Sequence, residues 1–385
     1  MKLIPYGRQH ISNQDIRFVS KALKEDLITT GRYVKKFENK ISRFLEVKYT
    51  ATCNSGTSAL HLALIAIGLE KDDVIIMPAI NFIAVYNMAR LMNAKIFLAD
   101  VDPLTGQMTP KALLDCIKNN KLTKVKAIIT MYLAGHPENI LEFYNIKKKL
   151  NCFLIEDACH AFGSKYNFNN STFYVGSCKH SDIAVFSFHP LKTITTAEGG
   201  AITTNNKSLA KKIFLSRSHG ILRRSNFHWK YDVSSVGFNY RLSDINCALG
   251  LSQLKNLNKF INYRKKIYFY YKKKFDLFTD LIKFPIYNPF SFSSYHLFLI
   301  NIDFKKIGLD KNDFFLFLKK KNIILQYHYI PLYKFSNFYE KNIKLINSEK
   351  YYQNTVSLPI FYKITKKDVD KICKFIYLFI SKKKF

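Results

Sequence analysis

The chain has 385 residues, of which 48% are hydrophobic and 15% aromatic, so a disordered protein is excluded and a folded chain with one large and one small domain is expected. Its formal net charge of +32 raises nucleic acid or an anionic membrane surface as a partner. The excess is diffuse, however, with Lys-Lys-Lys runs at 147–149, 272–274, 319–321 and 382–384. An anionic, phosphorylated small substrate suits the charge equally well, and we expect neither nucleic acid nor a membrane as a partner.

The seven cysteines are scattered and form no Cys-x-x-Cys pair, so the sequence predicts neither a zinc site nor a disulfide framework. Cys178 and His180 lack a third and fourth ligand at suitable spacing, and we therefore expect no metal. The N-terminus has no apolar signal-peptide core, and no apolar run approaches the ~18–20 residues of a membrane span. The cytoplasm is the expected location.

The first half of the chain alternates short β-rich runs with amphipathic stretches. Ser12 and Asp15 resemble a capping box that starts a helix running to about Asp26. Helical spacing predicts further helices over 33–45, 57–68, 81–92, 110–119 and 138–149. The predicted strands are 49–53, 74–77, 94–98, 127–131, 152–156, 183–188 and 200–204. This rhythm predicts an α/β fold, with a mostly parallel sheet covered by helices on both faces.

The C-terminal part has a different character. A helical pattern covers about 243–275, with a break near 257–259. Beyond Pro285 we predict strands around 295–303 and 323–329 and helices around 310–320 and 366–381. We divide the chain into an N-terminal segment with a large domain, residues 1–250, and a linking helix with a smaller α+β domain, residues 251–385. No low-complexity linker separates the two, so we expect them to pack closely.

Lys192 lies in the window FSFHPLKTITTAEGGAITTNN, residues 186–206. An apolar strand there runs into a polar turn with Ser187, His189 and the lysine, and a Gly-Gly pair that permits close backbone approach opens the next β-rich run. An amine at the exit of a buried strand can form an imine with an aldehyde, which is how pyridoxal phosphate is anchored in most of its enzymes. The alternative is a solvated lysine in a lysine-rich chain, and this window alone leaves both open.

Catalysis with pyridoxal phosphate also needs an acid at the pyridine nitrogen, a cradle for the phosphate and a flat group against the ring. Asp157 ends an apolar strand, where sites form in open α/β sheets, although it could equally cap the next turn. The turn Ser55-Gly56-Thr57 opens a helix whose free amides attract anions, although such a turn is also ordinary capping. Phe82 could lie against the ring or belong to the core.

Taken in order, these segments resemble the DegT/DnrJ-type nucleotide-sugar aminotransferases, which have the fold-type I architecture of pyridoxal-phosphate enzymes. The resemblance runs from IPYGRQHIS near the start to HYIPLY at 328–333. Its most specific parts are TTGRYVKKFE, NSGTSALHLAL, IEDACHAFGS, FSFHPLKTITTAEGGAITTNN, SRSHGI and GFNYRLSDINCALGLSQL. Several long motifs in this order are hard to explain by chance.

The resemblance implies a role for each candidate residue. Lys192 would bind the cofactor covalently and act as general acid and base, and Asp157 would partner the pyridine nitrogen. Phe82 would lie on the ring. His160 falls where many members of the family carry a glutamine that contacts the ring hydroxyl, and a neutral imidazole can make a similar bond. Small residues would hold the phosphate, namely Gly56, Thr57 and Ser187.

The resemblance also implies a homodimer with shared active sites. Asn239, in GFNYR, matches a residue that reaches across a dimer interface to the phosphate of the partner. Tyr240 and Arg241 beside it would face the sugar nucleotide. The same role is expected of His328 and Tyr329, which begin the HYIPLY motif.

Within the family, FHPLKTITTAEGGA, SHGIL and HYIPLY are most similar to enzymes of the pseudaminic-acid pathway, which serves cell-surface glycans. The implied reaction is a ping-pong transfer of the amino group of L-glutamate to the 4-keto group of UDP-2-acetamido-2,6-dideoxy-β-L-arabino-hexos-4-ulose. The product would be UDP-4-amino-4,6-dideoxy-N-acetyl-β-L-altrosamine. Amination of another UDP- or dTDP-linked keto sugar, of the perosamine or bacillosamine type, stays open. No role follows for His219.

Two other functions are weighed against transamination. The sugar dehydratases of the same family carry a histidine in place of the lysine, so Lys192 argues against dehydration. A regulator that binds cofactor or sugar without turnover is a rival from another class. The joint presence of Lys192, Asp157, Ser187 and Asn239 argues against it, and the sequence therefore predicts a transaminase.

Overall fold

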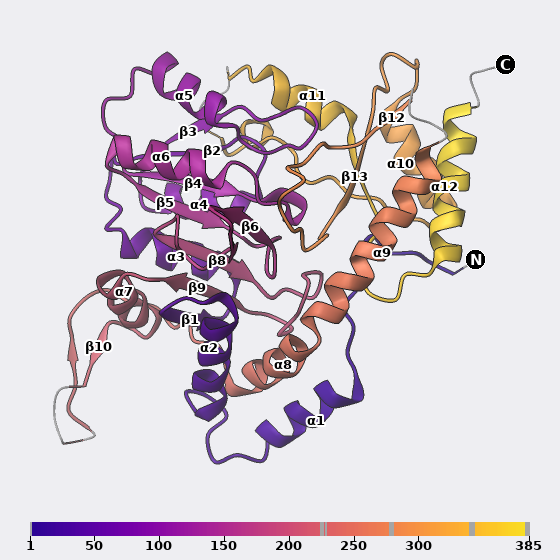
Figure 1. The fold of residues 1–385 in the computed structure, drawn as a ribbon. Helices are drawn as coiled ribbons and strands as arrows, with labels where there is room; N and C mark the ends of the chain where they lie inside the picture. The colour runs from indigo at the N-terminus through magenta and orange to yellow at the C-terminus, as the bar shows by residue number, and fades with distance from the viewer. Residues whose placement is uncertain (1, 224–226, 228, 277–280, 339–342, 382–385) are drawn as a thin grey trace.

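The computed structural model describes residues 2–223, 227, 229–276, 281–338 and 343–381. Its main body is a seven-stranded sheet in the order β1-β9-β8-β5-β4-β2-β3, with helices packed around it (Figure 1). Neighbouring strands run parallel, except that β9 is antiparallel to both β8 and β1. The strands are β1 (Tyr49–Cys53), β2 (Val74–Pro78), β3 (Lys95–Ala99), β4 (Ala127–Met131), β5 (Phe153–Asp157), β8 (Ile183–Ser187) and β9 (Gly200–Thr204). The predicted α/β fold with a mostly parallel sheet is confirmed.

Eight helices of the described chain accompany this sheet. Ser12 caps the first of them as predicted, because its hydroxyl accepts from the backbone N–H of Asp15 at 3.3 Å and its own N–H donates to the Asp15 carboxylate at 2.7 Å. The helices are α1 (Asn13–Ala22), α2 (Arg32–Leu45), α3 (Gly56–Ala66), α4 (Ile83–Leu91), α5 (Pro110–Asn119), α6 (Ile140–Leu150), α7 (Lys207–Arg217) and α8 (Asp244–Lys255). The first ends earlier than predicted, and α7 was not predicted.

The C-terminal part packs around a second sheet, β12 (Ile282–Lys283), β13 (Phe298–Ile302) and β14 (Thr355–Leu358). Its helices are α9 (Leu257–Phe275), α10 (Lys311–Lys320), α11 (Ile346–Asn354) and α12 (Lys366–Ser381). In Figure 1, α9 continues the direction of α8 and carries the chain from the main sheet to this second layer. Ile4 also packs in the second core, so both ends of the chain contribute to it, and the division near residue 250 stays a proposal.

The strand predicted at 323–329 is wrong. Only Ile323 and Gln326 form isolated bridges, with Ile4 and Ser357 respectively. The backbone between and beyond them forms no strand, and the side chains of residues 326–330 line a cavity described below. Instead of that strand, the chain forms the 3₁₀ helix η3 (Leu332–Lys334) shortly afterwards.

Smaller elements complete the fold. They are the 3₁₀ helix η1 (Leu133–Gly135), the hairpin β6 (Lys165–Phe168) with β7 (Ser171–Tyr174), and β10 (Ile221–Leu222) paired with β11 (Asp232–Val233). The β10 segment projects from the body in Figure 1.

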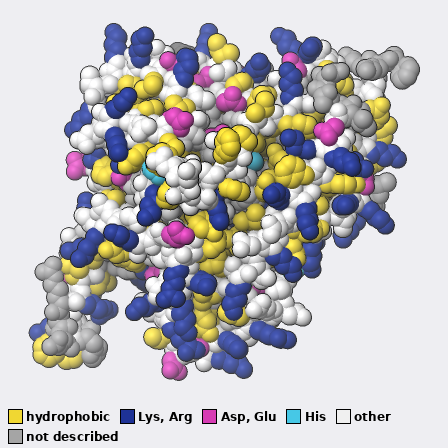
Figure 2. Space-filling model, in the orientation of Figure 1, with side chains coloured by type: hydrophobic (Ala, Val, Ile, Leu, Met, Phe, Trp, Pro, Cys, Tyr) yellow, Lys and Arg dark blue, Asp and Glu magenta, His cyan; other side chains and the backbone are white. Residues whose placement is uncertain are grey.

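In the described part of the chain, no helix is long and apolar enough to cross a membrane. All seven cysteines are free thiols. Figure 2 shows lysine and arginine side chains spread over the visible face rather than gathered in one patch.

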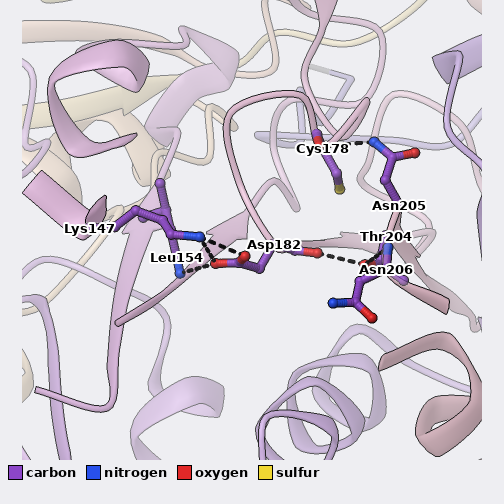
Figure 3. A network of polar contacts seen from close by, with 7 residues as sticks. All are labelled: Lys147, Leu154, Cys178, Asp182, Thr204, Asn205 and Asn206. Atoms are coloured by element: carbon purple, nitrogen blue, oxygen red, sulfur yellow. Dashed lines mark hydrogen bonds and ion pairs between the residues drawn. The ribbon is translucent and has the colours of Figure 1, made fainter. Parts of the chain in front are cut away.

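The start of β8 is fixed by one carboxylate, shown in Figure 3. Both oxygens of Asp182 accept from the ammonium of Lys147 at 2.7 Å, and one of them also accepts from the backbone N–H of Leu154 on β5 at 2.8 Å. The carbonyl of Asp182 accepts from the hydroxyl of Thr204 on β9 at 2.7 Å. The beginning of β8 is therefore held between its two neighbours, and its far end delivers Ser187 to a defined place.

Candidate active site

A cavity of about 460 Å³ opens where β4, β5 and β8 end and where the chain leaves β1 for α3. Carboxyl ends of parallel strands are the usual place for a ligand in an open α/β sheet. The cavity is lined by most of the predicted site residues, namely Gly56, Thr57, Phe82, Asp157, His160, Ser187, Lys192, His328 and Tyr329. Residues more than two hundred positions apart in the sequence therefore meet in one pocket.

Lys192 is half-buried in the loop that follows β8. Its backbone N–H donates to the carbonyl of His189 at 2.9 Å, which tightens the turn. Burial lowers the pKa of the Lys192 amine from its usual 10.5, while the neighbouring Cys159 and Asp157 oppose the shift. More of this amine is neutral at neutral pH than in a solvated lysine, and the neutral amine is the nucleophile. The solvated-lysine alternative does not describe this environment.

Asp157 is the last residue of β5 and is buried. One of its carboxylate oxygens accepts from the backbone N–H of Cys159 at 3.2 Å, so it does cap the following turn. Burial raises the pKa of Asp157 above its usual 3.8, while the hydrogen bonds from Cys159 and the charge of Lys192 oppose this. A buried carboxylate in that state is stabilised by a cationic ligand atom, so capping and binding are compatible at this residue.

The phosphate candidate is a tight meeting of three backbone segments. The helix α3 begins at Gly56, and its first amides have no partner within the helix. A Cβ at Gly56 would lie 2.9 Å from the Cβ of Ser187, and a Cβ at Gly200 would lie 2.4 Å from the carbonyl oxygen of Ser55. Only glycine allows these approaches, as predicted for the Gly-Gly pair. The amides of Gly56 and Thr57 and the hydroxyl of Ser187 thus lie together, and a helix start of this kind binds anions.

His160 lies in the cavity as a neutral ring. Its Nε2 atom is 2.9 Å from the hydroxyl of Tyr329, and its buried Nδ1 atom has no partner in the described chain. Burial lowers the pKa of His160 well below 6.5. The ring of His296 lies 4.2 Å away between centroids, and its Nδ1 is also buried without a partner among the described residues. Both imidazoles therefore keep one nitrogen for a ligand.

Phe82 precedes the first residue of α4 and lines the cavity. Its side chain is 53% exposed, so the core alternative is excluded in this chain. Its ring lies 5.7 Å from the ring of Tyr329 between centroids, in a tilted arrangement. A flat ligand entering the cavity would meet this exposed ring.

Three predicted site residues lie outside the cavity of their own chain. Asn239 is exposed, and its carbonyl accepts from the side chain of Asn54 at 3.5 Å. The hydroxyl of Tyr240 is 3.1 Å from Nδ1 of His61 on α3, and Arg241 is not among the lining residues. The structure does not bring Tyr240 and Arg241 to a substrate in their own chain, and their roles, like that of Asn239 at the site of a partner, stay predictions.

The cavity also contains side chains that the sequence analysis left without a role. They are Tyr6, Asn81, Glu198, His296 and Gln326. Tyr6 and Glu198 occur within quoted motifs, and His296 and Gln326 occur within predicted strands, but no local spacing marks any of the five as a site residue.

These residues fit a bound pyridoxal phosphate. The glycine-lined turn with Ser187 offers an anion cradle that any added Cβ would fill. Lys192 offers an amine with a lowered pKa, Asp157 a buried carboxylate, and His160 an unpaired ring nitrogen. Each requirement of the cofactor is met by a residue of the same cavity.

Comparison with known proteins also indicates an aminotransferase. The profile of the DegT/DnrJ/EryC1/StrS aminotransferase family matches residues 9–377. The UDP-4-amino-4,6-dideoxy-N-acetyl-beta-L-altrosamine transaminase of Campylobacter jejuni subsp. jejuni serotype O:23/36 (strain 81-176) is 37% identical over 387 residues, with 99% of both chains covered. The GDP-perosamine synthase of Escherichia coli O157:H7 is 32% identical over 384 residues, with 100% of both chains covered.

A solved structure resembles the fold over its whole length. Helicobacter pylori PseC, an aminotransferase involved in the biosynthesis of pseudoaminic acid, superposes with a TM-score of 0.87 at 30% sequence identity, covering 99% of this chain and 100% of that one. A family profile over nearly the entire chain and relatives above 30% identity agree with the cavity. The chain therefore belongs to the DegT/DnrJ/EryC1/StrS aminotransferase family and is a sugar aminotransferase that depends on pyridoxal phosphate.

Proposed function

We propose that this enzyme transfers the amino group of L-glutamate to C4 of UDP-2-acetamido-2,6-dideoxy-β-L-arabino-hexos-4-ulose. The product is UDP-4-amino-4,6-dideoxy-N-acetyl-β-L-altrosamine, on the way to pseudaminic acid. The observation that carries this proposal is the 37% identity, over 99% of both chains, to the Campylobacter jejuni transaminase of that name. The 32% identity to GDP-perosamine synthase supports a second candidate, amination of a perosamine-type sugar.

When bound, pyridoxal phosphate supplies the aldehyde that receives the amino group and a ring that withdraws electrons from the reacting carbon. In the proposed mechanism Lys192 would hold the cofactor covalently, and its amine, when neutral, would accept and return a proton at the reacting carbon of the substrate. Its lowered pKa supports this role, since an amine must be neutral to accept a proton. Asp157 keeps the pyridine nitrogen protonated, and its burial strengthens that interaction.

The remaining residues of the cavity hold and orient the cofactor in this proposal. Gly56, Thr57 and Ser187 bind the phosphate through two amides and a hydroxyl. Phe82 covers one face of the ring, which its exposed side chain allows. His160 contacts the ring hydroxyl through Nδ1, because Tyr329 already occupies its Nε2.

We propose further that the enzyme acts as a cytoplasmic homodimer in which Asn239 contacts the phosphate at the partner's site. The exposed position of Asn239 beside Asn54, directly before the phosphate turn, supports this arrangement. Large apolar side chains that a monomer would leave exposed to water support the presence of an interface. They are Ile11, Ile16, Leu23, Leu27 and Ile28 near α1, and Phe227, Trp229, Tyr231, Val233 and Val236 around β11.

Mass spectrometry of the products from a panel of keto sugars tests the reaction. The panel pairs L-glutamate with a UDP-linked 4-keto-6-deoxy-N-acetyl hexose, a dTDP-linked 4-keto-6-deoxyglucose and a GDP-linked 4-keto-6-deoxy hexose. We expect the UDP-linked sugar to be aminated far better than the other two. A preference for the GDP-linked sugar would select the second candidate, and a preference for the dTDP-linked sugar would contradict both.

A further inference from the structure

Part of the cavity lining has no role in the cofactor chemistry above. It consists of Tyr6, Gln326 and His328, which we call the neutral wall. These residues come from the N-terminal segment and from the irregular segment that replaces the predicted strand at 323–329, not from the main sheet that carries Lys192 and Asp157.

The N-terminal segment is held in place by backbone hydrogen bonds. The N–H of Ile4 donates to the carbonyl of Asn322 at 2.9 Å, and the N–H of Ile324 donates to the carbonyl of Ile4 at 3.0 Å. The carbonyl of Tyr6 accepts from the N–H of Ile360 at 3.3 Å. Tyr6 is therefore fixed against the C-terminal part of the chain, with its half-buried side chain at the cavity.

The other two side chains are oriented by bonds that leave one polar group unused. Gln326 exchanges backbone hydrogen bonds with Ser357 at 3.3 and 3.0 Å. Its side-chain oxygen accepts from the backbone N–H of Tyr327 at 2.9 Å, so its bond with the Tyr6 hydroxyl is donated by the amide nitrogen, and the second N–H of that amide remains as a donor. His328 contacts the hydroxyl of Ser357 through Nδ1 at 2.8 Å, which leaves its Nε2.

All three groups are uncharged at neutral pH. Burial raises the pKa of the Tyr6 phenol, and the side chain of Gln326, its hydrogen-bond partner, opposes the shift. The phenol therefore stays protonated and can donate. Burial lowers the pKa of His328 to about 3, so its ring is neutral. The neutral wall thus presents two donors, the Tyr6 hydroxyl and the Gln326 amide, beside an uncharged imidazole.

The charges of the cavity decide which part of a nucleotide sugar can enter it. Among the described residues that line it, Lys192 is the sole lysine or arginine, and Asp157 and Glu198 are the sole carboxylates. Lys192 is assigned to the cofactor, so this lining has no further lysine or arginine for the strong charge-assisted bonds that a diphosphate can accept. An uncharged sugar ring with an amide substituent matches phenol, amide and imidazole groups.

We infer that Tyr6 and Gln326 bind the 2-acetamido group of the acceptor sugar, by donating to its carbonyl oxygen. The inference rests on the proposed function and names the residues that select an N-acetylated sugar. A carbonyl oxygen has two lone pairs and can accept from both donors. A hydroxyl at this position places its oxygen two bonds closer to the sugar ring than the acetamido oxygen, so it cannot reach both donors, and a site with a donor left poorly paired discriminates against it.

Calorimetric titration of the pyridoxal-phosphate-loaded enzyme with UDP-N-acetylglucosamine and with UDP-glucose tests the inference. These unreactive nucleotide sugars differ only in the substituent at C2. The wild type should bind the acetamido sugar about tenfold more tightly, a difference of about 1.4 kcal/mol. Tyr6→Phe and Gln326→Leu should each remove most of this preference and change the Kd for UDP-glucose by less than about twofold. Tyr362→Phe, which removes a phenol outside the cavity, should keep it.

Each other outcome is informative. Equal binding of the two sugars by the wild type, or equal weakening of both in Tyr6→Phe, overturns the inference. The half-reaction with L-glutamate, followed by the absorbance of the cofactor, should stay within about twofold in both variants, and a large loss there would assign the neutral wall to the amino donor. If the wild type shows the preference but forms no altrosamine product, the proposed reaction fails and the inference stands. If the product forms and Tyr6→Phe keeps the preference, the inference fails alone.

Discussion

The Nε2 atom of His160 lies 2.9 Å from the hydroxyl of Tyr329, and this contact joins the edge of the main sheet to the segment at 326–329. Burial raises the pKa of Tyr329 well above its usual 10 and lowers that of His160 well below 6.5. A neutral phenol therefore meets a neutral imidazole, and the contact is a hydrogen bond between uncharged groups in a buried site. Removing one partner of such a bond leaves the other buried without a hydrogen bond, which lowers the free energy of unfolding.

Tyr329→Phe should leave Nε2 of His160 buried without a partner and lower the free energy of unfolding by about 1–3 kcal/mol. Urea denaturation measures the loss. Tyr270→Phe is the matched control, because it also removes one phenol hydrogen bond, 2.8 Å to Asp370 at the protein surface, and should cost no more than about 0.5 kcal/mol. Equal small losses in the two variants would mean that the contact does not stabilise the fold.

Lys192 should be the residue that binds the cofactor covalently. Borohydride reduction of the loaded enzyme should fix a pyridoxyl group on the tryptic peptide that contains it, and peptide mass spectrometry identifies the site. Lys192→Ala should retain cofactor but lose turnover by several orders of magnitude, because both the covalent anchor and the proton carrier are removed. Lys207→Ala, an exposed lysine at the start of α7, should behave like the wild type. Labelling at another lysine would refute the assignment.

Asp157→Asn should slow the half-reaction with L-glutamate far more than it weakens cofactor binding, since the amide cannot keep the pyridine nitrogen protonated. Stopped-flow absorbance measures the rate. Asp115→Asn is the control, because it changes a surface carboxylate paired with Lys111 on α5 that does not line the cavity. A rate within about threefold of the wild type corresponds to only ~0.7 kcal/mol in the barrier. That result would mean that Asp157 only caps the turn at Cys159 and has no role in the reaction.

Glu156, next to Asp157, should make the stability of the enzyme depend on pH. Its carboxylate accepts from the hydroxyl of Tyr132 and the backbone N–H of Gly176, both at 3.1 Å, but burial is the larger effect and raises its pKa from 4.5 to about 7. The folded state holds the proton more tightly than the unfolded state. The resulting stability is complete below pH 4.5 and is lost as the pH rises through about 7, on the order of 3 kcal/mol at about 1.4 kcal/mol per pKa unit.

Glu156→Gln carries no charge to bury, so its free energy of unfolding should fall less than that of the wild type between about pH 5 and about pH 8. Urea denaturation at both pH values measures the difference. Glu70→Gln, at an exposed position, should follow the wild type. The prediction fails if Glu156→Gln declines as steeply as the wild type.

Mixed dimers test whether Asn239 serves the partner. Lys192→Ala and Asn239→Trp should each be inactive alone, and refolding an equal mixture should make about half of the dimers mixed. In a mixed dimer one site carries both lesions, whereas the other combines an intact Lys192 with an intact Asn239 from the other chain. Activity should return to about a quarter of the wild type. Native mass spectrometry must show the mixed dimers, and their presence without activity would mean that Asn239 serves its own chain or no site.

Local patterns predicted the main sheet well because its strands are short β-rich runs closed by polar turns, several of them almost entirely apolar, such as β2 and β8. The bounds of β1, β4 and β9 were predicted exactly as observed over 49–53, 127–131 and 200–204. The helix α7 was missed although its sequence, KSLAKKIFLSR, follows a cap at Asn206 and buries Leu209, Ala210 and Ile213 at helical spacing. The strand at 323–329 failed because its two bridges depend on Ile4 and Ser357, and local periodicity cannot anticipate such distant partners.

The residues of the candidate site also differ in whether local sequence patterns can predict them. Asp157, Ser187 and Lys192 follow predicted strands, so the topology of a parallel sheet was enough to bring them to one edge. Tyr6 and Gln326 meet only because Ile4 pairs with the chain around residue 323. That contact spans most of the sequence and leaves no short-range signal. The cofactor end of the cavity was therefore accessible to sequence reasoning, whereas of the neutral wall only His328 was expected to face the substrate.

The pairing of Ile4 has a practical consequence for producing the enzyme. An affinity tag joined close to Ile4 would burden the segment that carries Tyr6, a residue of the cavity lining. Removing the first residues would also free the backbone groups that Asn322 and Ile324 now satisfy. A tag placed after α12 follows a helix whose residues do not line the cavity. Purification through the C-terminus is therefore the safer choice for measuring substrate preference.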